Sequence, residues 1–140
     1  MNGVIADVNF QGHFARLLYI LQSDDWLPEW NRLGLGVHTF RDLGLDPRTR
    51  DRAVCELCQA RGLILITGNR NDDGPDSLEA TIRDAGSEAL PVITLGNAQR
   101  VLTDIEFATD VALGLLEYLI DMRKDSSAFL GTGRQYLPKA

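Results

Sequence analysis

The chain has 140 residues, of which 44% are hydrophobic, and this length fits one domain with a substantial hydrophobic core. Its formal net charge of −6 argues against a protein that coats nucleic acids in general, but not against a nuclease, because carboxylates that bind a metal add to the acidic total. No apolar run approaches the ~20 residues that span a bilayer, and no basic leader is visible, so we expect a cytoplasmic protein without a membrane partner.

The first predicted element is a buried strand. Residues 3–8 (GVIADV) are short and apolar, and they end in a polar step that contains Asp7 and Asn9. Residues 10–22 have apolar side chains at helical spacing and predict a helix. Because an acid at the end of a buried strand needs a partner, Asp7 is a candidate site residue.

The next stretch predicts two helices and one strand. Residues 24–32 are typical of a short helix broken at Pro28, and residues 37–40 of a second strand. Asp46 precedes Pro47, which is the pattern of a helix N-cap followed by proline at the first helical position. We therefore expect a helix from this point to about residue 60.

The third strand, residues 63–67, leads into the most polar stretch of the chain. Residues 68–77 contain two Asn, three Asp and one Arg but no large apolar side chain. Asp76, with Glu79, resembles a capping box for the following helix, so its role as a cap is favoured over a role as a metal ligand. Asn and Asp are also the usual residues of tight turns, so a plain polar loop remains an alternative.

The last part of the pattern is one strand and one helix. We expect a fourth strand over 90–95 and a long helix that ends near Met122, with Thr103 and Glu106 as its capping box. Residues 123–140 lose this pattern and predict a loosely ordered tail outside an α/β domain of residues 1–122. Apolar strands that alternate with helices indicate a parallel sheet of four or five strands flanked by helices on both faces.

Polar residues follow three of these strands, and ligands bind outside the carboxyl ends of strands in such sheets. Carboxylates and amides without His or Cys suit a hard divalent cation, Mg²⁺ or Mn²⁺. The candidate metal ligands are Asp7, Asn9, Asp51, Asn69, Asp72 and Asp73. Asp51 has a second interpretation, since an acid favours a helix N-terminus.

Arginine is concentrated near the same segments. Of the 14 basic residues only two are Lys, which suits bidentate phosphate binding but equally a GC-rich genome. The candidate RNA-binding residues are Arg41, Arg48, Arg50 and Arg70.

Three other patterns carry less weight. Cys55 and Cys58 have redox spacing but fall inside a predicted helix, so we expect reduced thiols that only pack. The two His residues are not at motif spacing for zinc. Residues 131–134 (GTGR) resemble part of a phosphate loop, but no strand precedes them and no Gly-Lys-Ser follows.

The order of these segments resembles the PIN-like domain superfamily over about residues 3–122. The resemblance is carried by Asp-Val-Asn after the first strand, HTFRDLGL at the second, an acid before an apolar helix, and GLILIT before a polar loop. The branch it resembles most is the compact one often found near toxin–antitoxin loci. This resemblance implies a PIN fold and, in active members, Mg²⁺- or Mn²⁺-dependent cleavage of RNA.

By position, the resemblance makes Asp7 the first catalytic acid and Asp51 the helix acid. The third-strand motif of that branch usually reads Thr-x-Asp-x-Asp-Phe, and here Asn69 and Asn71 stand in place of both Asp residues. Asp72 or Asp73 would supply a carboxylate after a shift of one or two residues, with Asp72 as the third catalytic residue. Metal binding should then be weak, and Asn69→Asp should strengthen it.

Two functions follow from this departure. The first is a metal-dependent ribonuclease of the toxin type, and the second is a catalytically degenerate module that binds protein or RNA without cleaving. The number of carboxylates that reach one metal separates them. RNA and a cognate antitoxin or other protein are the expected partners, and a homodimer is the expected assembly.

Overall fold

The computed structural model describes residues 1–68 and 77–139 of the chain. Its sheet has five strands: β1 (Gly3–Ala6), β2 (Gly36–His38), β3 (Leu63–Thr67), β4 (Val92–Leu95) and β5 (Arg134–Leu137). They lie in the order β2-β1-β3-β4-β5, and every neighbouring pair is parallel. The predicted α/β class with a parallel sheet is therefore confirmed, and all the strands end at one edge.

The described residues form six α-helices: α1 (Gln11–Leu21), α2 (Leu27–Leu33), α3 (Asp51–Arg61), α4 (Leu78–Asp84), α5 (Ala98–Thr103) and α6 (Ile105–Lys124). Two short 3₁₀ helices, η1 (Val8–Phe10) and η2 (Ser126–Ala128), follow β1 and α6. In the part of the chain that is described, no helix is long and apolar enough to cross a membrane.

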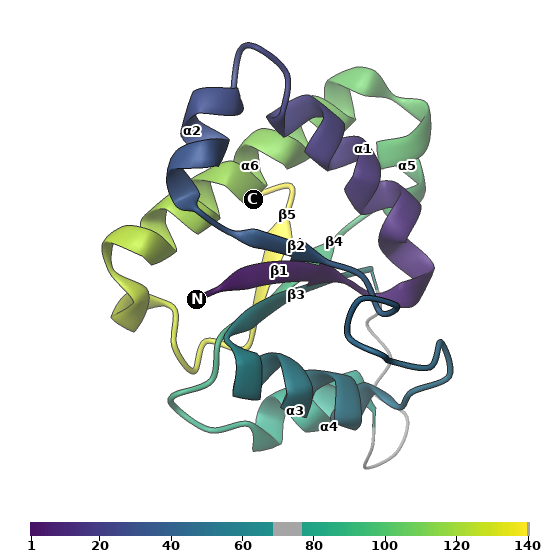
Figure 1. Ribbon diagram of the computed structural model, residues 1–140, viewed down its shortest axis with the longest axis vertical. Helices are drawn as coiled ribbons and strands as arrows, with labels where there is room; N and C mark the ends of the chain where they lie inside the picture. Colours follow the sequence, from purple (N-terminus) through teal and green to yellow (C-terminus); the bar gives the residue numbers. More distant parts are fainter. Residues whose placement is uncertain (69–76, 140) are drawn as a thin grey trace.

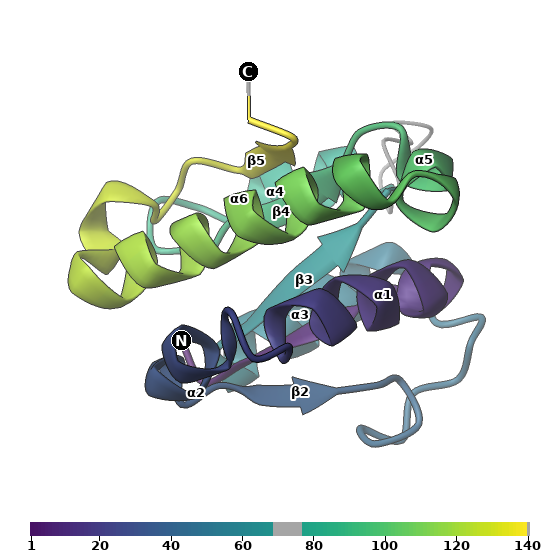
Figure 2. The same ribbon diagram turned by 90° about the horizontal axis from the view of Figure 1, so that it is seen from above.

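The helices cover both faces of the sheet, as Figures 1 and 2 show. The helices α1, α2, α5 and α6 pack on one face, where Val4, Ala6, Ile64 and Ile66 contribute to the larger core. On the other face, α3 and α4 pack over a smaller core that contains Ile5. We call this second surface the α3–α4 face. Successive residues of a strand point to opposite faces of the sheet. Because both faces are covered by helices, the side chains on each face are apolar.

Two predicted helix starts are wrong. The helix α3 begins at Asp51, while Asp46 closes a turn in which its carboxylate accepts from the backbone N–H of Arg48 at 2.7 Å. The pattern failed because Asp and Pro are as favourable in a turn as at a helix start. Likewise, Asp104 caps α6 in place of Thr103, since the Asp104 carboxylate accepts from two backbone N–H groups of the first turn.

The expected break at Pro28 also differs in the structure. Pro28 lies in the first turn of α2, where it needs no N–H donor and does not interrupt the helix. Ser77 caps α4 by accepting from the Ala80 N–H at 3.2 Å, while Asp76 lies outside the described residues.

The segment after Met122 is not a loosely ordered tail throughout. The helix α6 continues to Lys124, and β5 pairs with β4 along four residues and buries Leu137 in the larger core. An edge strand this short, with Arg, Gln and Tyr in three of its four positions, has no apolar run to reveal it in the sequence. Figure 2 shows it beside β4 at the border of the sheet.

Candidate functional site at the carboxyl edge of the sheet

Asp7 occupies the predicted position at the carboxyl end of β1, in the interior of the sheet. Its backbone N–H donates to the carbonyl of Ile66 at 2.8 Å and so continues the β1–β3 ladder by one residue. The hydroxyl of Thr67, a fully buried residue, donates to Asp7 Oδ2 at 2.8 Å. The partner that a partly buried acid requires is thus a threonine on the neighbouring strand, and this bond fixes the orientation of the carboxylate.

Asp51 reaches the same end of the sheet from α3, of which it is the first residue. This helix connects the parallel strands β2 and β3, so it begins toward their carboxyl edge, and Cys55 lies one turn further along it. Burial raises the pKa of the Cys55 thiol to about 12, with smaller contributions from Cys58, Asp51 and Asp7, while Arg134 opposes them. Two carboxylates and one guanidinium from three different elements thus contribute to the electrostatics of this thiol.

Arg134, from β5, is the site residue that the sequence reasoning missed. Its side chain is only 5% exposed on the α3–α4 face, where it forms an ion pair with Glu79 of α4. Its Nη1 donates to the hydroxyl of Thr94, a fully buried residue, at 2.7 Å. Thr94 is the register partner of Thr67 on β3.

A row of polar side chains therefore crosses three neighbouring strands of this face near the carboxyl edge, from Asp7 through Thr67 to Thr94, and Arg134 of the fourth strand bonds to its end. The local sequence contains little signal for this row. A threonine at the end of an apolar strand is compatible with simple β-propensity. The Arg134–Glu79 pair joins residues 55 positions apart, and no spacing rule links them.

The remaining predicted residues are placed less centrally, and some are not described. Asn9 lies exposed in η1, and Arg41 and Arg48 are exposed in the turns between β2 and α3. Arg50 is exposed at the N-cap position of α3, next to Asp51. Outside the described residues lie Asn69, Arg70, Asn71, Asp72, Asp73 and Asp76.

Hydrogen bonds of Asp42 hold the turn that follows β2 and contains Arg41. The Asp42 carboxylate accepts from the Thr39 backbone N–H at 2.9 Å, and the Thr39 hydroxyl accepts from the Asp42 N–H at 3.1 Å. The hydrogen bond from the Thr39 backbone, followed by that from its hydroxyl, lowers the pKa of Asp42 below its usual value. Asp42 therefore holds the turn that presents Arg41.

Gly68 marks a close approach directly after β3. A Cβ atom at this position would lie 2.4 Å from Cε1 of the Phe10 ring. Phe10 in turn packs against His13 of α1, with ring centroids 5.2 Å apart. Glycine is needed at position 68 because the aromatic ring covers the backbone where β3 leaves the sheet.

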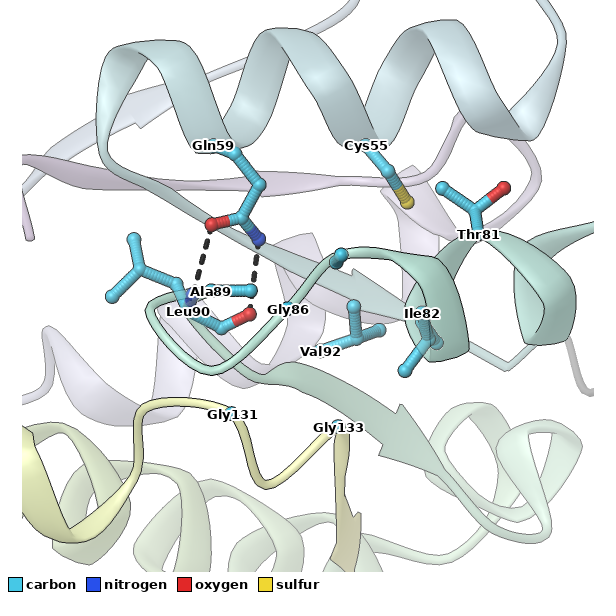
Figure 3. A pocket seen from close by; sticks show the side chains of 11 residues that line it. Cys55, Gln59, Thr81, Ile82, Gly86, Ala89, Leu90, Val92, Gly131 and Gly133 are labelled. Carbon is cyan, nitrogen blue, oxygen red and sulfur yellow. Dashed lines mark hydrogen bonds between the residues drawn. The ribbon is translucent and has the colours of Figure 1, made fainter.

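The two cysteines are unpaired and buried, as expected of packing residues. Burial is the main cause that raises the pKa of each thiol to about 12, so neither is a thiolate near neutral pH. Cys55 lines a small cavity between α3, α4 and β4, shown in Figure 3. Its volume of about 20 Å³ has room for little more than one water molecule.

Gln59 closes one end of this cavity. Its side-chain amide donates to the carbonyl of Leu90 at 3.0 Å and accepts from the Leu90 N–H at 2.8 Å, the pair of dashed lines in Figure 3. These two hydrogen bonds tie α3 to the segment before β4. The cavity is a packing feature and not a binding site.

A metal site built only from the described residues would have few carboxylates. Among residues 1–68 and 77–139, no group of three or more His, Cys, Asp and Glu side chains is close enough to hold one ion. Asp7 and Asp51 are the two carboxylates of the predicted metal site that lie among these residues. Hard oxygen donors of this kind fit Mg²⁺, which often takes one or two carboxylates and completes its shell with water and substrate phosphate.

Comparison with known proteins gives no further assignment, because no family model, no curated protein and no solved structure matches this chain.

Proposed function

We propose that this chain is a PIN-like, metal-dependent ribonuclease that cuts RNA phosphodiesters with Mg²⁺ or Mn²⁺. The observation that carries the proposal is the Asp7 carboxylate, oriented by Thr67 at the carboxyl edge of an all-parallel sheet, with Asp51 at the start of α3. In open α/β sheets this edge is the usual place for a ligand.

The two acids would bind the cation, and each has a defined position from which to do so. One oxygen of Asp7, Oδ2, accepts from Thr67, so Oδ1 is the oxygen that would face a cation. Asp51 would contribute its carboxylate from the first turn of α3. When bound, a divalent cation lowers the pKa of a bound water and neutralises charge that develops on the phosphate.

The arginines support phosphate as the substrate group. Arg41, Arg48 and Arg50 are exposed in the segment that leads from β2 to Asp51. Their charges would attract an RNA backbone and hold it over the acids, with affinity that falls as salt rises. An RNA substrate, an antitoxin as protein partner and a homodimer all belong to this proposal as consequences of the family resemblance.

A cytoplasmic location is part of the same proposal. It is supported by Cys55 and Cys58, which are both unpaired. Free thiols are usual in reducing compartments and unusual in secreted proteins.

The degenerate binding module is the second candidate, and one observation favours it. Within the described part of the chain, no three His, Cys, Asp or Glu side chains lie close enough together to hold one ion. With Asn at both positions where the resembling branch has Asp, the metal would be bound more weakly than in an active member. Such a module would still bind RNA or protein but would no longer cleave RNA.

The test is a calorimetric Mn²⁺ titration together with an RNA cleavage assay. We expect Mn²⁺ binding by the wild type and a loss of about tenfold or more in affinity for Asp7→Asn, because a charge contact with the ion is removed without a change of shape. Cleavage should be lost in both Asp7→Asn and Asp51→Asn. Asn69→Asp should increase the affinity.

Asp121→Asn is the matched control, since Asp121 is an exposed acid on α6, across the sheet from the site. It should change neither metal affinity nor cleavage. Mn²⁺ binding that depends on Asp7 without any cleavage would favour the module. If Mn²⁺ binds equally to wild type and Asp7→Asn, the ribonuclease proposal is wrong.

A further inference from the structure

A polar groove runs along the edge of the sheet between α4 and β5. It has a volume of about 510 Å³, within the range of small-ligand sites. Its walls include Glu79 and Arg83 from α4, Arg134 and Tyr136 from β5, and the backbone of Gly131 and Gly133, which we name together the α4–β5 groove. The small cavity of Figure 3 lies on its inner side and shares both glycines.

One nitrogen of the Arg134 guanidinium is buried beside this groove without a hydrogen-bond partner among the described residues. Its Nε donates to Glu79 and its Nη1 to Thr94, but its buried Nη2 has no hydrogen-bond partner among the described residues. A buried guanidinium nitrogen without an acceptor is costly, and such groups call for a specific explanation. An anionic oxygen of a ligand would satisfy it.

The charge of the groove also departs from that of the chain. Its lining contains two Arg and one Glu, whereas the whole chain has a formal net charge of −6. Arg83 is exposed at the rim, one turn along α4 from Glu79. This excess of positive charge in the groove of an acidic protein favours the binding of a phosphate group. It also repels an acidic peptide less than the remaining surface does.

Tyr136 supplies an aromatic surface at the outer side. Its side chain is 47% exposed although it belongs to a strand, and its neighbour Leu137 is buried. Stacking on an exposed aromatic ring is the usual way in which single-stranded nucleic acid is held without sequence preference. The groove thus combines a phosphate-binding charge with a stacking platform.

A peptide that adds a strand to β5 is the main competing ligand, and one contact argues against it. The Tyr118 hydroxyl donates to the carbonyl of Tyr136 at 3.1 Å. This carbonyl is therefore already occupied, and strand addition depends on free backbone groups at the sheet edge.

We propose that the α4–β5 groove binds one nucleotide of single-stranded RNA, with a phosphate oxygen at Arg134 and the base against Tyr136. The inference rests on the proposed ribonuclease function and adds to it a second contact, away from Asp7. Arg134 is linked to Asp7 through the protein interior, because Arg134 bonds to Thr94, whose register partner Thr67 bonds to Asp7.

The experiment measures the fluorescence anisotropy of a labelled single-stranded oligoribonucleotide in EDTA, so that binding is read without cleavage. Tyr136→Ala should weaken binding by about fivefold or more, as expected when a stacked base loses its aromatic partner. Tyr136→Phe should restore affinity to within about twofold, since the ring and not the hydroxyl is needed. Arg83→Ala should weaken binding and reduce its salt dependence.

Two matched controls separate the groove from the remaining surface. Tyr19→Ala removes a tyrosine that is 81% exposed on α1, and Arg32→Ala removes an exposed arginine of α2, both on the other side of the sheet. Neither should change RNA binding by more than about twofold, a general screening effect.

The outcomes divide the two proposals. RNA binding that depends on the groove residues, without cleavage in Mn²⁺, would support the groove proposal and contradict the ribonuclease proposal. Cleavage by the wild type that is unaffected by Tyr136→Ala and Arg83→Ala, with RNA affinity also unchanged, would overturn the groove alone. Absence of RNA binding, or binding of an extended peptide that Tyr136→Ala abolishes, would overturn it in favour of a different ligand.

Discussion

The ion pair between Arg134 and Glu79 gives a quantitative test of how β5 is attached to the rest of the protein. Arg134→Met keeps the length of the side chain and removes its charge. The variant leaves the Glu79 carboxylate, which is 31% exposed, without its partner. It also removes the hydrogen bond that Arg134 donates to the hydroxyl of the fully buried Thr94. Loss of one member of a buried pair costs about 3–5 kcal/mol, and the partial exposure of Glu79 puts our expectation at the lower end, about 3 kcal/mol.

This loss should be visible in urea unfolding followed by tryptophan fluorescence. Trp30 of α2 is 6% exposed and packs in the larger core, so its emission reports the global transition. For a chain of this size, about 3 kcal/mol corresponds to a fall of roughly 10 °C in Tm. The denaturant slope should be unchanged, because the same surface is exposed on unfolding.

Arg100→Met is the matched control for this variant. Arg100 pairs with Asp104 at 3.2 Å, but the two side chains are 57% and 36% exposed. Exposed pairs of this kind contribute about 0.2–1 kcal/mol, so the control should lose no more than about 1 kcal/mol. In a double-mutant cycle, Glu79→Leu with Arg134→Met should cost less than the sum of the single variants. Equal losses for Arg134→Met and Arg100→Met would refute the buried pair and the attachment of β5 through it.

Two further predictions concern the packing around the site. Burial raises the pKa of Cys55 and Cys58 from the ordinary 9.0 to about 12, so their stabilising contribution is present below pH 9 and is lost as pH rises toward 12. Wild type should lose about 2–3 kcal/mol of unfolding free energy between about pH 8 and pH 10, and a double alanine variant should not show this loss in equilibrium urea titrations; the same slope in both would contradict it. Gly68→Ala should destabilise the protein by about 1–3 kcal/mol through its clash with the Phe10 ring, and Phe10→Ala should relieve most of that added cost, whereas additive losses in thermal unfolding would show that the two do not touch.

The parts of the fold that could be predicted are those specified by local composition. The strands β1, β3 and β4 are visible in the sequence because each is buried on both faces and therefore reads as a short apolar run between helices. The parallel arrangement follows from this alternation. The start of α3 could not be placed, because Asp46 with Pro47 satisfies the rules for a turn and for a helix start equally well.

For the site, topology made part of the prediction possible. Asp7 and Asp51 are 44 positions apart in sequence, but Asp7 follows β1 and Asp51 begins the helix after β2, and parallel strands end at one edge. Thr67, Thr94 and Glu79 could not be assigned, since their roles depend on side-chain contacts across strands and between α4 and β5. No local pattern carries such contacts.

Arg134 explains why the end of the chain was misread. An edge strand exposes unpaired backbone groups, and charged side chains that point inward are one way in which proteins prevent such edges from pairing with other chains. Here the buried guanidinium of Arg134 is tolerated because it donates hydrogen bonds to Glu79 of α4 and to Thr94 of β4. The same features that make β5 a safe edge, few apolar residues and a buried cation, removed its strand signal from the sequence. They also bring a guanidinium to the polar row that begins at Asp7, so the segment that looked dispensable completes the electrostatics of the candidate site.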